Sequence, residues 1–327
     1  MLHLRWRSVI CFANSQLLRQ SCQLNFANRQ KSTINVEQSS TYGFLIPNID
    51  LKEVGAATSI GKRQYQEDRF CYKPFNDGSI FMGIFDGHGG SLAADFTVSK
   101  LPSVIENVID DTTDLKESFE KAFVEVNTEL MEYIRRGQES RRYSGTTATV
   151  CLITHNIHLH TASVGDTRAI LCRNGKAVTL TTDHNPENEK ERKRIEQEGG
   201  LIVSNSLGEP LVNGRLAMTR SIGDFDLKPY GVTSVPECSY TTIKPAQDSF
   251  LILITDGVSF SLPDQEVVDV VLSCSTTQEA ANQVIDLAAC YGSVDNASAV
   301  LLPLGSWGRF APSGSYVPNR SLFAPRD

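Results

Sequence analysis

Apolar residues follow two different periods along the chain, and each period predicts a type of element. Leu115, Phe119 and Phe123 open a stretch with three- and four-residue spacing, which is typical of an amphipathic helix. Short apolar runs bounded by turn residues predict buried strands instead. The predicted helices are residues 91–101, 114–136, 186–198 and 277–291, with a further helix that opens at Ser261 and Asp264. The predicted strands are residues 54–61, 79–85, 146–154, 157–164, 168–173, 249–255 and 297–304.

The strands in the middle of the chain are joined by turns and not by helices. Asn174-Gly175 is a strong hairpin signal, and His155-Asn156 and Gly165-Asp166 separate neighbouring runs. This succession predicts an antiparallel meander. With helices on its flanks, we expect an α+β domain over residues 50–305, an antiparallel β-sandwich covered by helices. Residues 306–327 are rich in Pro, Ser, Gly and Arg and are expected to form a flexible tail.

Composition narrows the classes of function. The net charge of −7 argues against nucleic-acid binding, which favours basic surfaces. The eight cysteines are scattered without a C-x-x-C pair, so neither a disulfide framework nor a zinc site is indicated. A reducing compartment is the simpler interpretation. No apolar window of about 18 residues is present, so we expect no membrane partner.

The first 36 residues differ from the rest of the chain in charge. They contain no acidic residue but include Arg5, Arg7, Arg19, Arg29 and Lys31. An arginine-rich, acid-poor and amphipathic N-terminus is typical of a mitochondrial transit peptide. A disordered tail without function is the alternative.

Carboxylates stand at the ends of several predicted strands. Asp86 and Asp256 each end an apolar run, Asp295 precedes the last strand, and Glu67-Asp68 follow the first strand and its turn. Strand ends can converge on one edge of a sheet, where carboxylates repel one another unless a cation neutralises them. Oxygen ligands without thiolates select Mg²⁺ or Mn²⁺. Two such ions about 3.5–4 Å apart can activate a water for direct in-line attack on phosphorus.

Each of these features also has an ordinary explanation. An Asp-Gly pair alone is a common turn, so the metal hypothesis rests on the conjunction of the acids. His88 could donate a proton to a leaving alkoxide, although most surface histidines are simply solvated. The guanidinium fork of Arg63 suits phosphate, although it too could be solvated. Gly87 allows close approach of the backbone, whose carbonyl could also bind a metal ion.

These residues lie in segments that resemble the metal-dependent protein phosphatases (PPM, type 2C). The matching segments occur in the order of the family. They are Arg63-Gln-Tyr-Gln-Glu67-Asp68, Phe85-Asp-Gly-His-Gly-Gly90, Ser144-Gly-Thr-Thr-Ala148, Val164-Gly-Asp166-Thr-Arg168, Asp183-His184-x-Pro186, Gly214-Arg-Leu-Ala-Met-Thr-Arg-Ser-Ile-Gly-Asp224, Thr255-Asp-Gly257 and Asp295-Asn296. The resemblance implies an antiparallel β-sandwich flanked by helices, and hydrolysis of phosphoserine and phosphothreonine in proteins.

The resemblance also implies a metal-binding role for several residues. Asp86 would bridge two Mn²⁺ or Mg²⁺ ions, and the Gly87 carbonyl would bind one of them. Asp256 and Asp295 would complete the ligand set, while Glu67 and Asp68 would hold metal-bound waters.

The remaining roles implied by the resemblance concern phosphate, the leaving group and a third ion. Arg63 would bind the phosphate, and His88 would be the general acid. Asp166 would belong to a third metal site. That site is short of a ligand, because Phe260 stands where many family members carry an acid.

Within the family, the chain is most similar to the mitochondrial phosphatases that act on the branched-chain 2-oxo acid dehydrogenase complex. The similarity rests on the transit-like leader and on Asn205-Ser-Leu-Gly208, Asp256-Gly-Val-Ser-Phe260 and Gly305-Ser-Trp-Gly308. It implies a mitochondrial matrix protein whose substrate is a phosphoserine on the decarboxylase subunit of that complex. The same chemistry on other mitochondrial phosphoproteins is the alternative.

Other phosphatase classes and a non-catalytic role are disfavoured. No cysteine is followed six residues later by arginine, as Cys-x5-Arg enzymes require. The segment Asp224-Phe-Asp226-Leu-Lys228 departs from the Asp-x-Asp-x-Thr/Val pattern of aspartyl-phosphate enzymes. Neither G-x-G-x-x-G nor a Walker lysine indicates nucleotide binding. A pseudophosphatase that only binds phosphoproteins is expected to lose metal-site acids, and Asp86, Asp256 and Asp295 all remain.

Overall fold

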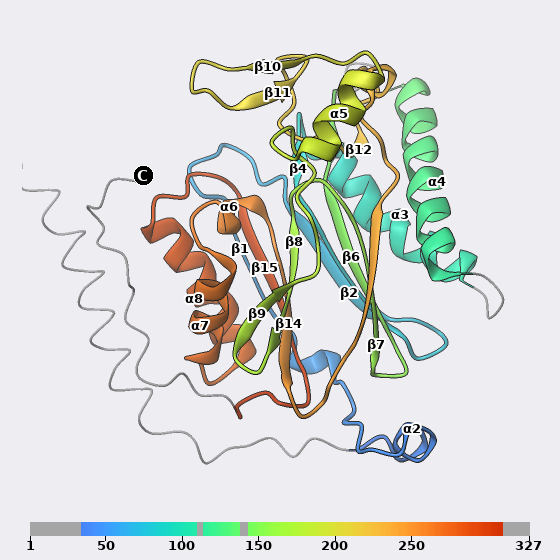
Figure 1. Cartoon of the computed structure of the whole chain (residues 1–327), viewed down its shortest axis with the longest axis vertical. Helices are drawn as coiled ribbons and strands as arrows, with labels where there is room; N and C mark the ends of the chain where they lie inside the picture. The colour runs from blue at the N-terminus through green and yellow to red at the C-terminus, as the bar shows by residue number, and fades with distance from the viewer. Residues whose placement is uncertain (1–33, 110–113, 138–142, 310–327) are drawn as a thin grey trace, which may run out of the picture.

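Two five-stranded antiparallel sheets pack face to face in the computed structural model, which describes residues 34–109, 114–137 and 143–309 (Figure 1). The first sheet has the order β1 (Gly55–Ser59), β15 (Ala297–Pro303), β14 (Asp248–Ile254), β8 (Arg168–Arg173) and β9 (Lys176–Thr179). The second has the order β13 (Glu237–Thr242), β7 (His158–Val164), β6 (Ala148–Thr154), β3 (Ile80–Phe85) and β2 (Arg69–Pro74).

Helices cover the outer faces of both sheets, so the predicted α+β sandwich is confirmed (Figure 1). α3 (Leu92–Val108) and α4 (Leu115–Arg135) lie on the second sheet, and α7 (Asp264–Leu272) and α8 (Thr277–Cys290) lie on the first. The remaining elements are α2 (Val36–Tyr42), η1 (Leu51–Glu53), α5 (Glu189–Gln197), η3 (Lys228–Tyr230), α6 (Asp256–Ser259), the pair β10 (Ile202–Ser204) and β11 (Pro210–Val212), and a small sheet of β12 (Ile222–Gly223), β5 (Gly145–Thr146) and β4 (Gly87–His88).

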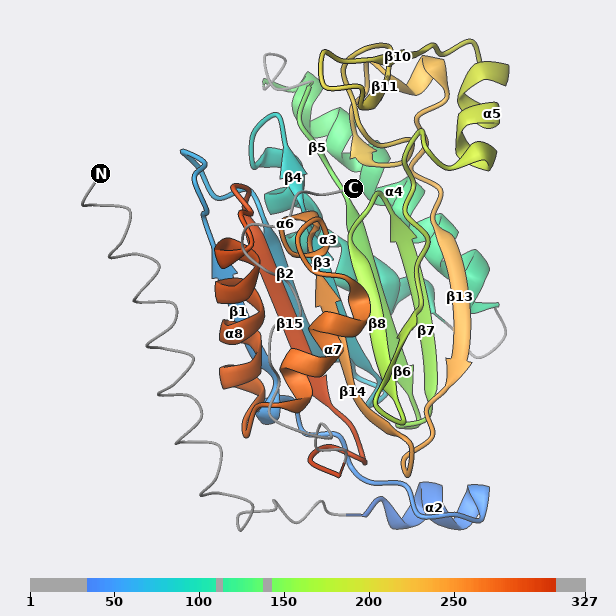
Figure 2. The same ribbon diagram turned by 60° about the vertical axis from the view of Figure 1, so that its left-hand side comes forward.

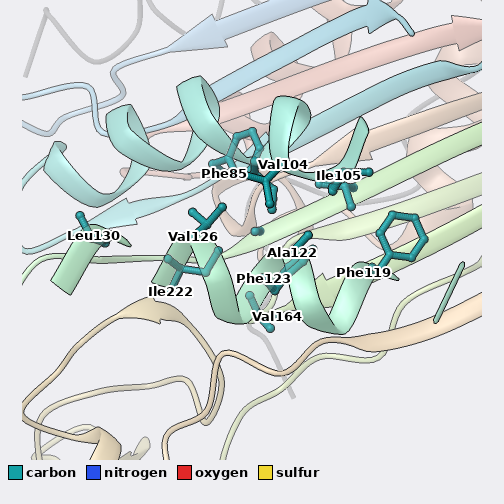
Figure 3. Packing of buried hydrophobic residues seen from close by; sticks show 14 of the residues in the cluster. Phe85, Val104, Ile105, Phe119, Ala122, Phe123, Val126, Leu130, Val164 and Ile222 are labelled. Carbon is teal, nitrogen blue, oxygen red and sulfur yellow. The ribbon is translucent and has the colours of Figure 1, made fainter. Parts of the chain in front are cut away.

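The continuous apolar strands are explained by burial on both faces. Along β3, Ile80, Met82 and Ile84 point into the space between the sheets, while Phe81 and Phe85 pack under α3 and α4. Successive side chains of a strand point to opposite faces, so a strand between two packed layers needs apolar residues at every position. Figure 3 shows Phe85 in the helix-covered layer.

The long helix α4 follows its predicted periodicity. Phe119, Phe123, Val126 and Leu130 are buried against α3 and the second sheet (Figure 3). The helix begins after Asp114, whose carboxylate accepts a hydrogen bond from the Lys116 N–H at 3.1 Å. An N-cap of this kind satisfies a backbone donor that has no partner within the helix.

The predicted helix 186–198 was wrong at its start. α5 begins at Glu189, and its cap is Asn188, whose side chain accepts from the Lys190 N–H at 3.0 Å. The Asn185 side chain instead accepts from the amides of Glu187 and Asn188, which forms a turn before the helix. A short asparagine side chain serves a turn and a helix cap equally well, and only the structure separates the two.

The two predicted terminal segments lie almost entirely outside the described residues. Only residues 34–36 of the predicted leader and 306–309 of the predicted tail are described. Within the latter, the ring centroid of Trp307 lies 6.0 Å from that of Phe250 on the first sheet. Within the described ranges, no helix combines the length and the apolar content that a membrane crossing requires.

Candidate active site

The predicted acids meet at one end of the sandwich because the strand registers align their neighbours. Arg69 in β2 pairs with Phe85 in β3, which places Asp68 next to Asp86. Ile254 in β14 pairs with Ala299 in β15, which brings the start of α6 close to the residues before β15. Figure 2 shows α6 and β4 at the same end of the molecule.

Asp68 connects the two sheets through its carboxylate. Its Oδ2 accepts hydrogen bonds from Thr255 Oγ1 at 3.1 Å and from Ser298 Oγ at 2.7 Å. Burial raises the pKa of Asp68 to about 7; the two hydroxyls oppose the shift, while the charges of Asp256 and Asp295 add to it. The carboxylate is therefore held in place but strongly disfavoured as an isolated anion.

Asp86 occupies the centre of the group of acids. Its backbone is fixed by Thr147, whose N–H donates to Asp86 O at 2.9 Å and whose Oγ1 accepts from Asp86 N at 3.0 Å. Burial raises the pKa of Asp86 well above its ordinary value, and the carboxylates of Asp256, Asp68 and Asp166 raise it further. Burial likewise raises the pKa of Asp256, whose carboxyl group is close enough to hydrogen-bond Asp86.

The donor set fits a hard divalent cation. One oxygen each of Asp68, Asp166 and Asp256 is buried without a hydrogen-bond partner, which is costly for a carboxylate. Carboxylate oxygens are the ligands that Mg²⁺ and Mn²⁺ prefer, and a cation would remove the mutual repulsion. In the ranges that the structure describes, no three His, Cys, Asp or Glu side chains already surround a common point.

Asp295 forms an ion pair with Arg63 beside the other acids. Arg63 Nη2 and Asp295 Oδ2 are 2.6 Å apart, and the two side chains are 55% and 33% exposed. An exposed ion pair of this kind is weak, about 0–1 kcal/mol, so either partner can be released to a ligand. In this structure, the Arg63 guanidinium is the counter-ion of Asp295.

Asn296 joins the segments around this pair. Its Nδ2 donates to the carbonyls of Ile60 and Tyr65, each at 3.0 Å, and its Oδ1 accepts from the Glu67 N–H at 2.8 Å. The loop that carries Arg63 is thereby fixed at both ends. Glu67 is half-buried beside the acids.

His88 has a partner that the sequence reasoning missed. Its Nε2 lies 2.8 Å from Asp224 Oδ2 and 3.0 Å from Oδ1. β5 separates the strands that carry the two residues: Gly145 pairs with His88 on one side and with Gly223 on the other. A Cβ on Gly145 would lie 2.2 Å from Asp224 Oδ2 and 2.4 Å from His88 Nε2, so only glycine leaves room for the pair.

In this pair, each partner favours the charged form of the other. Burial lowers the pKa of His88, but Asp224 and more distant acids outweigh burial and raise it. Burial raises the pKa of Asp224, yet His88 and the Ser221 hydroxyl, which donates to Oδ2 at 2.6 Å, bring it below its ordinary value. With Nε2 engaged, Nδ1 is the histidine nitrogen left without a partner. The one sequence feature that could have pointed to Asp224 as a site residue is its place at the end of the Gly214–Asp224 motif.

Asp166 and Phe260 are the two residues on which the expectation about a third metal site depends. Asp166 lies half-buried in the turn between β7 and β8, and burial together with Asp256 and Asp183 raises its pKa to about 7. Phe260 follows α6 and is 69% exposed, so it offers an apolar ring where a carboxylate would be needed.

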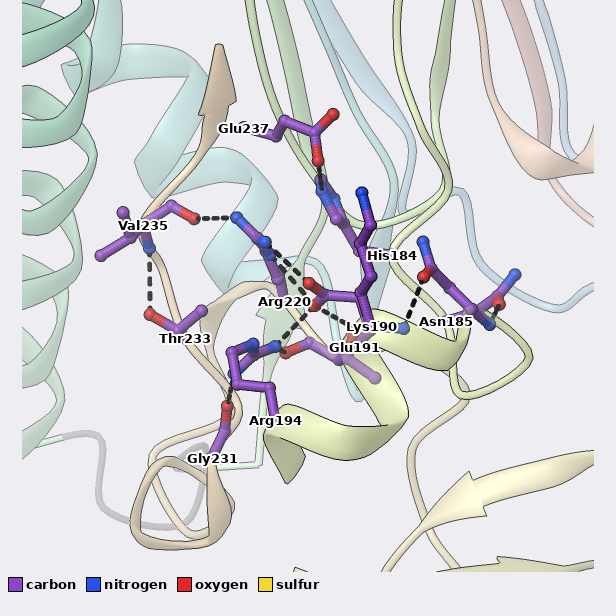
Figure 4. Close-up of polar contacts among 12 residues, drawn as sticks. His184, Asn185, Lys190, Glu191, Arg194, Arg220, Gly231, Thr233, Val235 and Glu237 are labelled. Carbon is purple, nitrogen blue, oxygen red and sulfur yellow. Dashed lines mark hydrogen bonds and ion pairs between the residues drawn. The ribbon is translucent and has the colours of Figure 1, made fainter. Parts of the chain in front are cut away.

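Residues 185–235 form an insert above the sandwich (Figure 2), and Glu191 binds three other residues of that insert (Figure 4). Glu191 accepts from Arg220 Nη2 at 2.7 Å, Arg194 Nη2 at 2.6 Å and Thr219 Oγ1 at 2.8 Å. Burial opposes ionisation, but the two guanidinium groups hold the pKa of Glu191 far below its ordinary value. The insert is thus held together by this ionic network and by a small apolar cluster of its own.

Comparison with known proteins gives a consistent result. The family model described as "Protein phosphatase 2C" matches residues 54–297. The chain is 42% identical over 287 residues to the mitochondrial protein phosphatase 1K of Xenopus laevis, covering 88% of this chain and 77% of that protein. It is 34% identical to protein phosphatase 1L of Bos taurus, covering 72% of this chain and 66% of that protein.

Solved structures agree in fold. A sex-determining protein of C. elegans superposes with a TM-score of 0.69 at 25% identity, covering 78% of this chain and 65% of that chain. The serine-threonine phosphatase 2C of Toxoplasma gondii superposes with a TM-score of 0.66 at 23% identity, covering 77% of this chain and 94% of that chain.

Proposed function

The chain belongs to the protein phosphatase 2C family, and from this premise we propose how its residues hydrolyse phosphoserine and phosphothreonine in proteins. It is a protein serine/threonine phosphatase. The observation that carries the proposal is the convergence of Asp68, Asp86 and Asp256, with unpartnered buried oxygens on Asp68 and Asp256. A fold needs no such repulsive group for stability, so the arrangement points to a bound cation.

Two divalent cations, Mn²⁺ or Mg²⁺, are the proposed cofactor. Asp86, the Gly87 carbonyl, Asp256 and Asp295 would hold them directly, and Glu67 and Asp68 would hold their waters. When bound, such a pair supplies an activated water at neutral pH and neutralises charge on the phosphoryl oxygens. Asp295 must leave Arg63 to join the set. Asp166 alone does not complete a third site, because Phe260 supplies no oxygen.

The chain's own residues perform the remaining tasks. Once released from Asp295, Arg63 offers its guanidinium fork to the phosphoryl group. His88 protonates the leaving oxygen of serine or threonine. This proton is needed because an unprotonated alkoxide is a poor leaving group. Asp224 accepts the hydrogen bond of Nε2 and so leaves Nδ1 as the atom that carries the transferred proton. Gly145 keeps the space for this pair.

The proposed substrate is a phosphoserine on the decarboxylase subunit of the branched-chain 2-oxo acid dehydrogenase complex, in the mitochondrial matrix. The similarity to a relative named as mitochondrial and the acid-poor, arginine-rich residues 1–36 support the location. The alternatives are the same chemistry on other mitochondrial phosphoproteins and a pseudophosphatase that binds without turnover.

A substrate comparison tests the proposal. The full chain, loaded with Mn²⁺, is incubated with the phosphorylated branched-chain complex and with another phosphorylated mitochondrial enzyme complex. We expect phosphate release from the branched-chain complex to be at least about tenfold faster. Equal rates would support the broader substrate range, and binding without release would support the pseudophosphatase. A fluorescent protein fused to residues 1–36 checks the location.

A further inference from the structure

Four large apolar side chains are exposed on the segments that carry or contact Arg63 and Asp295. They are Tyr65, Phe260, Val294 and Ile60, which are 74%, 69%, 49% and 44% exposed. We call these four residues the apolar rim. Single exposed apolar residues are ordinary, but a group of them beside a functional site indicates a binding surface.

The apolar rim is held by defined contacts. Asn296 donates to the carbonyls of Ile60 and Tyr65, and the Lys62 N–H donates to the carbonyl of Val294 at 2.9 Å. The segment that carries Phe260 also contacts Asn296. A Cβ on Gly257 would lie 1.9 Å from the Asn296 carbonyl oxygen, so α6 packs directly on the backbone of Asn296. Because the backbone is already ordered, a ligand would bind without the entropic cost of ordering these loops.

Arg63 lies within the apolar rim. It is three residues after Ile60 and two before Tyr65, and its guanidinium bonds Asp295, the residue after Val294. A polypeptide spans about 3.3–3.6 Å per residue. When Arg63 holds a phosphoryl group, the two residues on either side of the phosphoserine are therefore within reach of this surface.

We propose that the apolar rim selects phosphoproteins with apolar side chains next to the phosphoserine, which rests on the proposed function of Arg63 and the acids. The occupant is the polypeptide segment of the substrate, and Phe260 and Tyr65 provide the largest contact areas.

The test uses two phosphoserine peptides of equal length and charge. One carries leucine at two positions on each side of the phosphoserine, and the other carries serine there. The Mn²⁺-loaded full chain should hydrolyse the leucine peptide with a kcat/KM about tenfold higher, since apolar contacts discriminate by about this amount. Phe260→Ala and Tyr65→Ala should each bring the ratio of the two values toward one.

Two control variants test whether selection depends on the apolar rim and not on another exposed apolar residue. Val124→Ala truncates a residue that is 43% exposed on α4, and this variant should keep the wild-type ratio. Leu207→Ala truncates a residue that is 81% exposed in the insert. A ratio that responds to Leu207→Ala and not to Phe260→Ala would assign selection to the insert and overturn the proposal.

Two further outcomes separate this inference from the proposed function. If the wild type hydrolyses both peptides equally well, the apolar rim does not select, although the phosphatase assignment stands. If neither peptide releases phosphate with Mn²⁺ or Mg²⁺, the proposed function itself fails and the inference fails with it.

Discussion

Asp86 stands among other carboxylates, and its conformation is fixed by Thr146 and Thr147 and not by a cationic partner. A carboxylate held in this way destabilises the metal-free fold and is useful only when a cation is bound. Functional sites often lower the stability of the fold in this manner.

Replacing Asp86 with asparagine should change the stability of the metal-free protein and the catalytic activity in opposite directions. Asp86→Asn removes a carboxyl group whose ionised form is disfavoured by burial and by Asp256 and Asp68, so the melting temperature of the chelator-treated protein should rise by a few degrees. The kcat/KM for a phosphoserine peptide should fall about 100-fold or more, because a ligand is weakened. Thermal melting in EDTA and phosphate release with Mn²⁺ measure the two effects.

Asp248→Asn is the control for burial of an aspartate. Asp248 is fully buried and paired with Arg173 at 2.7 Å, far along β14 from the site. Its loss leaves Arg173 unpaired, so the melting temperature should fall while kcat/KM stays unchanged. If Asp86→Asn instead behaved like Asp248→Asn, the acids would have a structural role only.

Asp224→Asn tests the positioning of His88. An amide cannot replace the charged acceptor at Nε2, so kcat for a phosphoserine peptide should fall about 10–100-fold. Hydrolysis of an activated aryl phosphate should change much less, because that leaving group needs no proton. His88→Ala should show the same pattern, and the double variant should be no worse than the single ones. Equal losses on both substrates, or additive losses, would remove Asp224 from this role.

At the scale of elements, the sequence predicted the elements with a clear apolar period and missed those without one. α4 and the apolar strands β3, β14 and β15 have periods that burial imposes, so they could be recognised. β2 and β13 were missed because their residues are largely exposed or half-buried and show no apolar run. The two-residue strands β4, β5 and β12 carry no period at all, yet they bring His88 and Asp224 together.

The same limit applies to the site. The acids at strand ends were predicted because sheet edges bring such positions together, and the registers place Asp68 beside Asp86 and Asp256 near Asp295. The partner of His88 was not predicted. Asp224 is 136 residues away in sequence, and only the pairing of β4 and β12 with β5 joins the two.

A single change at Glu191 should loosen the insert. Glu191→Gln replaces the anion that two arginines share, and leaves their charges partly unpaired in a buried place. Breaking such a network costs about 3–5 kcal/mol locally. Hydrogen exchange of residues 185–235 should accelerate while β3 and β14 stay protected. Uniform acceleration across the chain would mean that Glu191 supports the whole fold.

At the scale of the whole molecule, the acids couple stability to pH and to metal. The pKa values of Asp68 and Asp166 are raised to about 7, so between pH 5 and 7 the folded protein binds more protons than the unfolded chain. Stability of the metal-free protein should therefore fall as pH rises through this window. His88, whose pKa is also raised, contributes in the same direction, whereas the lowered pKa values of His160 and His184 oppose it.

Metal should reverse this dependence. Protons and cations compete for the same carboxylates, so added Mn²⁺ should raise the melting temperature more at pH 8 than at pH 5.5. Melting curves at the two pH values, with EDTA and with Mn²⁺, provide the comparison. A metal-induced shift that is equal at both values, or a metal-free protein that gains stability toward pH 8, would contradict the account.

The most direct test of the central claim is phosphate release from a phosphoserine peptide as a function of Mn²⁺ concentration, using protein freed of metal by chelation. The account predicts no release in excess EDTA, saturable recovery with Mn²⁺, and a recovery curve displaced to higher Mn²⁺ in Asp256→Asn. Full activity in excess EDTA would contradict the claim that these carboxylates act by holding divalent cations.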